Sequence, residues 1–86
     1  MKVSIKKAIV TEWYEDGKTK EYAVRYDADK TMLQNAREIL REIKSDDYFK
    51  TLKLDSTQPE IEEGKYLFFA TSSKGYDISA DICFFE

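Results

Sequence analysis

The sequence predicts one α+β domain, in which a single helix packs on a four- to five-stranded, mostly antiparallel sheet in the order ββαβββ. Most of the chain alternates β-branched or aromatic residues with polar ones, as half-buried strands do. One stretch, residues 31–44, changes instead to the helical period. The 86 residues suffice for one domain, residues 1–86, and leave no room for a second.

The first two expected strands and the turn between them are residues 3–14, 19–27 and 15–18. Gly17 can take positive φ in this turn without strain. A two-residue loop would set Glu12 opposite Glu21, which is repulsive, whereas a three-residue loop with a bulge at Gly17 sets Glu12 opposite Lys20. We favour the three-residue loop.

The expected helix, residues 31–44, carries one apolar stripe and contains no Gly or Pro. The stripe consists of Met32, Leu33, Ala36, Ile39, Leu40 and Ile43. Thr31 and Gln34 have the T-x-x-Q spacing of a capping box, and a small shift of the helix start would make Asp29 the cap instead.

Three further strands are expected at residues 45–54, 65–72 and 76–86, with a loop at 55–64 that contains the single Pro59. Residues 65–72 are apolar on both faces, which is typical of a central strand. Alternation places Tyr48, Leu52 and Leu54 on one side of the first of these strands. In the last strand it places five side chains inward: Tyr76, Ile78, Ala80, Ile82 and Phe84. The order is compatible with a β-grasp layout, in which the strands share a mixed sheet.

The composition argues against most catalytic sites. The chain has no His, which removes the commonest general base and transition-metal ligand. The single Cys83 lies in a strand pattern without a neighbour that would lower its pKa, so we expect a core or interface thiol. We expect no cofactor and no metal. A lone Cys, no signal-peptide pattern and no long apolar run favour a cytoplasmic protein, of its own cell or of a host, rather than a membrane protein.

The charge is unevenly distributed. The net charge is −3; residues 1–25 carry six Lys/Arg and four Asp/Glu, whereas residues 55–86 carry two Lys and seven Asp/Glu. An acidic third is a poor surface for phosphate backbones and suits a basic protein partner. The alternative is a nucleic-acid-associated module, in which Trp13 and Tyr14 near the tip of the basic N-terminal hairpin stack on single-stranded bases.

The stretch YDADKT, residues 26–31, resembles the D-x-D-x-T signature of haloacid dehalogenase-type phosphatases. The resemblance implies catalytic roles for Asp27 and Asp29, with the remaining parts supplied by Thr51, Lys74, Asp77 and Asp81. The chain departs from that family because it is too short for a parallel sheet with several crossover helices. Four residues of strand also separate Asp77 from Asp81 by roughly 13 Å, too far to share one magnesium ion. We therefore favour helix capping as the role of this stretch.

One helix can cover only one face of the sheet, so apolar side chains on the other face need a different explanation. They would form an association surface, or the 55–64 loop would fold over them. The sequence thus predicts a non-catalytic module that binds a protein partner or a second copy by surface occlusion, as phage or mobile-element inhibitors of host defence would. The candidate binding residues are Trp13, Tyr14, Leu67, Phe69 and Phe85, and the uncovered set also includes Cys83.

Overall fold

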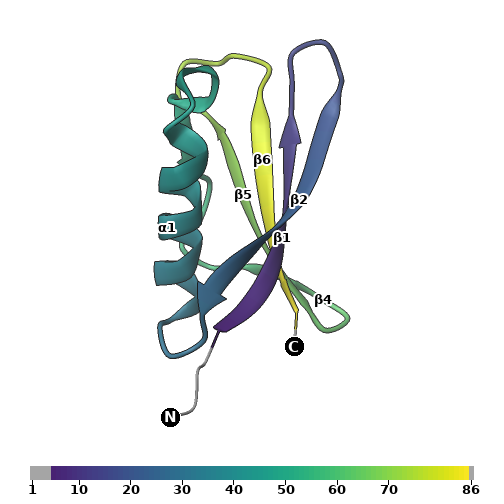
Figure 1. Ribbon diagram of the computed structural model, residues 1–86. Helices are drawn as coiled ribbons and strands as arrows, with labels where there is room; N and C mark the ends of the chain where they lie inside the picture. The colour runs from purple at the N-terminus through teal and green to yellow at the C-terminus, as the bar shows by residue number, and fades with distance from the viewer. Residues whose placement is uncertain (1–4, 86) are drawn as a thin grey trace.

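The computed structural model describes residues 5–85 and has one α-helix and a six-stranded sheet in this part of the chain (Figure 1). The elements are β1 (Ile5–Trp13), β2 (Thr19–Asp27), α1 (Met32–Lys44), the 3₁₀ turn η1 (Asp47–Phe49), β3 (Leu52–Leu54), β4 (Glu60–Glu62), β5 (Lys65–Ser72) and β6 (Ser79–Phe85). The single helix on an antiparallel sheet confirms the predicted α+β class.

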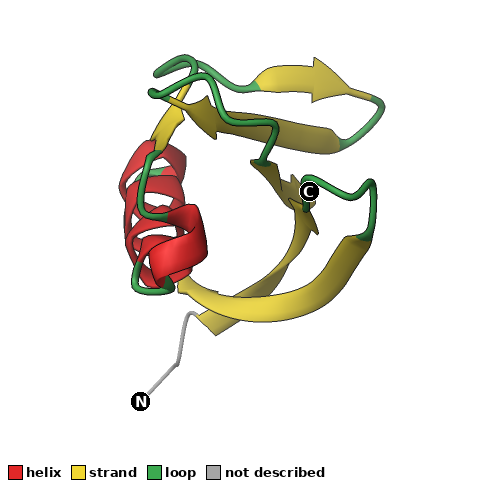
Figure 2. Cartoon of the chain, turned by 90° about the horizontal axis from the view of Figure 1, so that it is seen from above, coloured by secondary structure: helices red, strands yellow, loops and turns green. Residues whose placement is uncertain are grey.

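The strands lie in the order β2-β1-β6-β5-β3, and the short β4 pairs with the same edge of β5 that β3 uses. Every pairing described is antiparallel, so the mixed sheet of a β-grasp layout is not found. Seen from above, the sheet curls around the core and α1 lies against its concave side (Figure 2). The helix follows β2 at one edge and leads towards β3 at the other.

The β1–β2 hairpin has the predicted three-residue loop. The N–H of Tyr14 donates to the Lys18 carbonyl at 2.9 Å, and Gly17 takes a φ of 85° between them. Glu12 is therefore opposite Lys20, as expected. The carboxylate of Glu12 is buried, however, and it accepts its hydrogen bonds from tyrosine hydroxyls rather than from Lys20.

The helix buries the face that its apolar stripe predicts. Ala36, Ile39, Leu40 and Ile43 are buried, together with Asn35, while Met32 and Leu33 pack against the core from its margin. The strands contribute the other half of the core from alternate positions. These buried residues include Ala8, Val10, Phe68, Ala70, Ala80, Ile82 and Phe84. The Phe84 ring contacts Phe68 and Tyr26 edge to face, which closes the core near the start of the helix.

Three local expectations are wrong. Tyr48 lies in η1 rather than in a strand, because the Asp46 side chain accepts from the Tyr48 N–H at 3.0 Å and caps a tight turn. Tyr76 is 57% exposed, because β6 begins only at Ser79. The 55–64 segment is not all loop: β4 forms within it and pairs with β5.

No helix in residues 5–85 is long and apolar enough to span a membrane.

Leu40 tests the assigned core face. Leu40→Ala should lower the free energy of unfolding by about 2–5 kcal/mol, because it leaves a cavity between α1 and the sheet. Arg37→Ala, on the exposed side of the same helix, should change it by less than about 0.5 kcal/mol. Urea denaturation of both variants measures the difference, and equal midpoints would show that the core face is misassigned.

Candidate functional site

The face of the sheet that points away from α1 carries a row of apolar side chains, and we call this side the open face. Register places Ile9 of β1 opposite Cys83 of β6, and Cys83 opposite Leu67 of β5. Directly opposite residues of paired strands point to the same face. The three side chains therefore form one row across the middle of the sheet, and all three are half-buried.

Phe69 belongs to the next row, in which it is opposite Asp81. Phe69 is half-buried, whereas Trp13 on the neighbouring row is 44% exposed. A hollow of about 280 Å³ is lined by both aromatic side chains and by Asp55 and Asp81. The Trp13 indole N–H donates to the Asp81 carboxylate at 3.1 Å, which holds the ring at the margin of this hollow.

The 55–64 segment does not lie over the open face. Its strand β4 extends the sheet sideways, with Glu60 opposite Leu67 and Glu62 opposite Lys65. Ile61 of the same strand is 73% exposed. Asp55, the first residue of this segment, lines the hollow beside Phe69, but β4 lies beside β5 in the sheet, so of the two explanations for the apolar row the covering loop is not observed.

Phe85 lies at the end of the open face rather than at its centre. It is opposite Lys65 at the end of β6 and is 44% exposed. It also borders a second small hollow with Tyr26 and Met32, which belong to the helix side. Phe85 therefore extends the apolar surface of the open face along β6, from Cys83 towards the end of the strand.

Tyr14 is the one candidate that the structure separates from the others. Its ring stacks on Tyr48 at 5.2 Å and meets Phe49 edge to face. Trp13, its neighbour in the chain, is on the open face, because successive strand residues point to opposite sides. The hairpin tip therefore does not present Trp13 and Tyr14 as one aromatic surface.

Glu12 forms a buried polar cluster that the sequence analysis did not find. It is 7% exposed and accepts hydrogen bonds from the hydroxyls of Tyr22 at 2.9 Å and Tyr14 at 3.2 Å. Burial, and then the bonds to Glu12, raise the pKa of Tyr22 well above its ordinary value. The pKa of Tyr14 is raised for the same reasons. The sequence signal for this cluster was strand alternation, which places Glu12 on the same side of β1 as the buried residues Ala8 and Val10.

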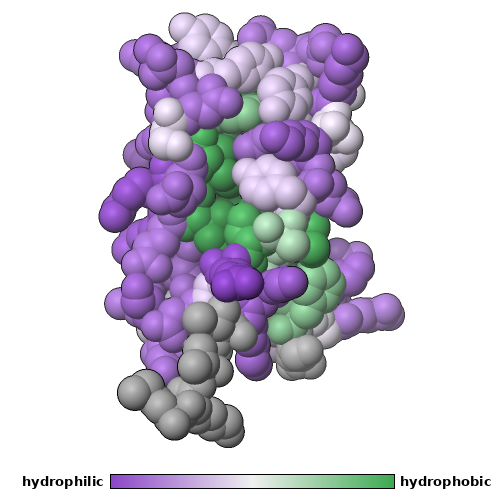
Figure 3. All heavy atoms as spheres, viewed as in Figure 1, coloured by the Kyte–Doolittle hydropathy of each residue, from purple (hydrophilic) through white to green (hydrophobic). Residues whose placement is uncertain are grey.

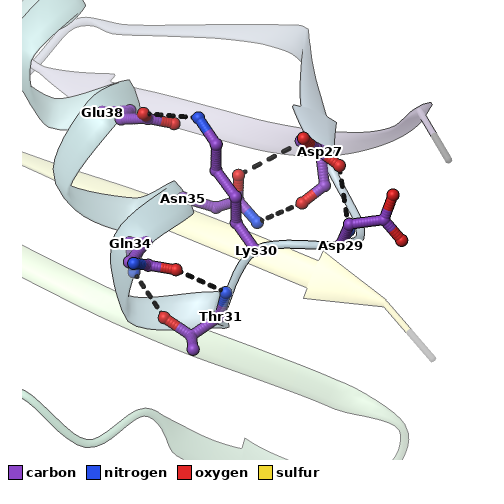
Figure 4. A network of polar contacts seen from close by, with 7 residues as sticks. All are labelled: Asp27, Asp29, Lys30, Thr31, Gln34, Asn35 and Glu38. Carbon is purple, nitrogen blue, oxygen red and sulfur yellow. Dashed lines mark hydrogen bonds and ion pairs between the residues drawn. The ribbon is translucent and has the colours of Figure 1, made fainter.

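The YDADKT stretch is the start of α1 (Figure 4). Thr31 is the N-cap: its hydroxyl accepts from the Gln34 N–H at 3.1 Å, and the Gln34 side chain accepts from the Thr31 N–H at 2.9 Å. The capping box is thus confirmed, with Thr31 rather than Asp29 as the cap. The Asp27 carboxylate accepts from the Asp29 N–H at 2.9 Å, which turns the chain before the helix.

The remaining residues that the phosphatase resemblance implies do not gather at this turn. The Thr51 hydroxyl pairs with Ser72 at 2.7 Å, between β3 and β5. Asp77 precedes β6, whereas Asp81 lies within it and bonds Trp13. In residues 5–85, no group of three His, Cys, Asp or Glu side chains is placed to hold a metal ion.

Cys83 is a half-buried thiol on the open face, as the strand pattern predicts. Burial raises the pKa of the thiol, and the nearby Lys65 opposes this only in part. The thiol is therefore neutral at physiological pH and contributes apolar surface to the row.

Comparison with protein-family models, curated proteins and solved structures gave no match.

The capping box can be tested by truncation. Thr31→Ala should cost about 0.5–2 kcal/mol of stability, because the Gln34 N–H loses its acceptor. Thr57→Ala in the exposed 55–64 segment is the matched control and should have little effect on the urea midpoint. Metal-dependent phosphomonoester hydrolysis that is lost in a folded Asp27→Asn variant would contradict the capping role.

The Glu12 cluster predicts a loss of stability at alkaline pH. The raised pKa of Tyr22 keeps its hydroxyl protonated in the folded state at pH values where the unfolded chain, with a pKa near 10.0, ionises. The free energy of unfolding should therefore fall as the pH rises above about 10. In Tyr22→Phe the fall should be smaller. An ultraviolet titration in which Tyr22 ionises together with unburied tyrosines would contradict this.

Proposed function

We propose that this protein is a non-catalytic module that binds a protein partner through the open face of its sheet. The observation that carries the proposal is the apolar row Ile9–Cys83–Leu67 with the hollow between Trp13 and Phe69, on a face that no other element covers in residues 5–85. Apolar surface of this kind costs roughly 25 cal/mol per Å² while it stays in water. A partner that fills the hollow removes that cost.

Acidic side chains around the row favour a basic partner surface. Asp81 and Asp55 line the hollow, and Glu60 is opposite Leu67 at the edge. Carboxylates at the rim of an apolar patch attract Lys and Arg during encounter and discriminate against acidic surfaces. The proposed partner therefore has an apolar protrusion with basic residues around it.

Binding of this kind acts by occlusion, because it needs no catalytic group and only excludes other molecules from the partner's surface. An inhibitor of a host-defence protein, encoded by a phage or a mobile element, would work in this way. A lone free thiol suits a reducing compartment, so we place this activity in the cytoplasm of the protein's own cell or of a host.

Phe69→Asp tests the proposal. The charge should abolish partner binding with little change in fold, because Phe69 is only half-buried. The matched control is Ile61→Asp, since Ile61 is 73% exposed and is opposite Tyr66 on the other side of the sheet. Tagged wild type and both variants are incubated with lysate, with and without prior nuclease treatment, and captured proteins are identified by mass spectrometry.

The expected result is a protein captured by the wild type and by Ile61→Asp, lost with Phe69→Asp and weakened by added salt. Capture that survives Phe69→Asp would contradict binding through the open face. Capture that disappears only after nuclease treatment would favour the nucleic-acid alternative.

A further inference from the structure

The outer edge of β2 has unpaired backbone groups. β2 ends the strand order, with β1 as its neighbour. The Tyr14–Lys18 backbone bond sets the hydrogen-bonded positions of this hairpin at even residues. In an antiparallel pair the alternate residues point their N–H and C=O groups away from the neighbour. In β2 these are the odd residues from Thr19 to Asp27; the central three, Glu21, Ala23 and Arg25, are exposed, and residues 5–85 supply no partner strand for them.

Asp27 shows that this edge can be paired. It belongs to the same set of odd residues, and the Asn35 side chain of α1 bonds both of its backbone groups (Figure 4). Asp27 N–H donates to Asn35 Oδ1 at 3.3 Å, and Asn35 Nδ2 donates to the Asp27 carbonyl at 2.8 Å. A side-chain amide thus takes the place of the next strand at one end of the edge, and the segment from Glu21 to Arg25 stays open.

Beside this open segment runs a groove of about 590 Å³ between β2 and α1. Tyr22 and Val24 line it from the strand, and Ile39 and Ile43 line it from the helix. Figure 3, viewed as in Figure 1, shows hydrophobic surface at the bottom of this groove and polar residues along both sides. An extended strand added to β2 would bond its edge and place alternate side chains in the groove.

We propose that the occupant is a second copy of this chain, paired antiparallel through β2 about a two-fold axis at Ala23. In that register Glu21 is opposite the partner's Arg25, and Arg25 is opposite the partner's Glu21. On the groove side, Tyr22 is opposite the partner's Val24, an aromatic and β-branched pair of the kind that stabilises sheets. The sequence of β2 is therefore complementary to itself.

Charge selects this register over its neighbours. A shift of two residues in one direction sets Glu21 opposite the partner's Asp27, and the two carboxylates repel each other. In that register the partner strand would also need the backbone groups of Asp27, which Asn35 already bonds. The opposite shift sets Glu21 opposite the partner's Ala23 and loses both ion pairs. Charges on an edge strand often prevent pairing. Here a strand of uniform charge is repelled by either Glu21 or Arg25, whereas a second β2 is attracted by both.

Charge reversal is the test. Glu21→Arg and Arg25→Glu each convert two attractive cross-strand pairs into two repulsive ones, so each variant should dimerise about tenfold more weakly than wild type or worse. An equimolar mixture of the two variants should form a heterodimer, because Arg then lies opposite Glu in both pairs. The double variant should also recover the dimer. Sedimentation velocity at low salt over a concentration series measures each dissociation constant.

A backbone variant separates strand pairing from side-chain attraction. Ala23→Pro removes the outward N–H at the centre of the interface and should abolish the dimer, since proline is tolerated only on an edge with a free N–H. Ala23→Val keeps the N–H and should keep the dimer. Circular dichroism checks that both variants fold; if Ala23→Pro does not, the charge-reversed mixture decides the proposal.

Wild type that remains monomeric at millimolar concentration would overturn the proposal, and so would a dimer that both charge reversals leave unchanged. Phe69→Asp should leave this dimer intact. A dimer lost in Phe69→Asp but retained in Ala23→Pro would assign self-association to the open face instead of the β2 edge.

Discussion

One helix of 13 residues has to cover a sheet of six strands, and the main features of the surface follow from that mismatch. The sheet responds by curling, so that α1 closes the concave side and a compact core forms between them (Figure 2). The convex side receives no helix from the part of the chain that the structure describes. The sheet also leaves an edge open: Asn35 bonds the backbone of Asp27 at the end of β2, and residues 5–85 supply no strand for the rest of that edge. The open face and the open edge thus have the same cause, which is that a single helix packs against a sheet of six strands.

The elements that sequence patterns predicted well are those whose structure depends on local spacing. The helix, its capping box at Thr31 and the three-residue turn at Gly17 each need only neighbours within a few positions. The bounds of β2 and β5 were also as expected, because alternation or a continuous apolar run extends over their whole length. Tyr48 and Tyr76 were misplaced since alternation was extended through turns, where a capping Asp or a late strand start ends it.

The candidate site was less predictable because it depends on which strands become neighbours. Leu67 and Phe69 could be placed on an uncovered face from alternation alone, but their cross-strand partners Cys83 and Asp81 are known only from the register. The sequence could not show that β2 lies at the edge, since strand order depends on long-range pairing. Glu12 shows the same limit: its charge suggested Lys20 as a partner, whereas burial favoured two neutral hydroxyls.

The two proposed surfaces meet at Ala23. Register continues the apolar row of the open face from Leu67 through Cys83 and Ile9 to Ala23, the last residue before the free edge. Pairing of two β2 strands about Ala23 would join this row to its copy and give one apolar band across both sheets. Two linked copies of a weak site bind a repeated or two-fold symmetric partner more tightly than one copy, because the second contact is intramolecular. Self-pairing at the edge would therefore strengthen occlusion by the face, although each depends on different residues.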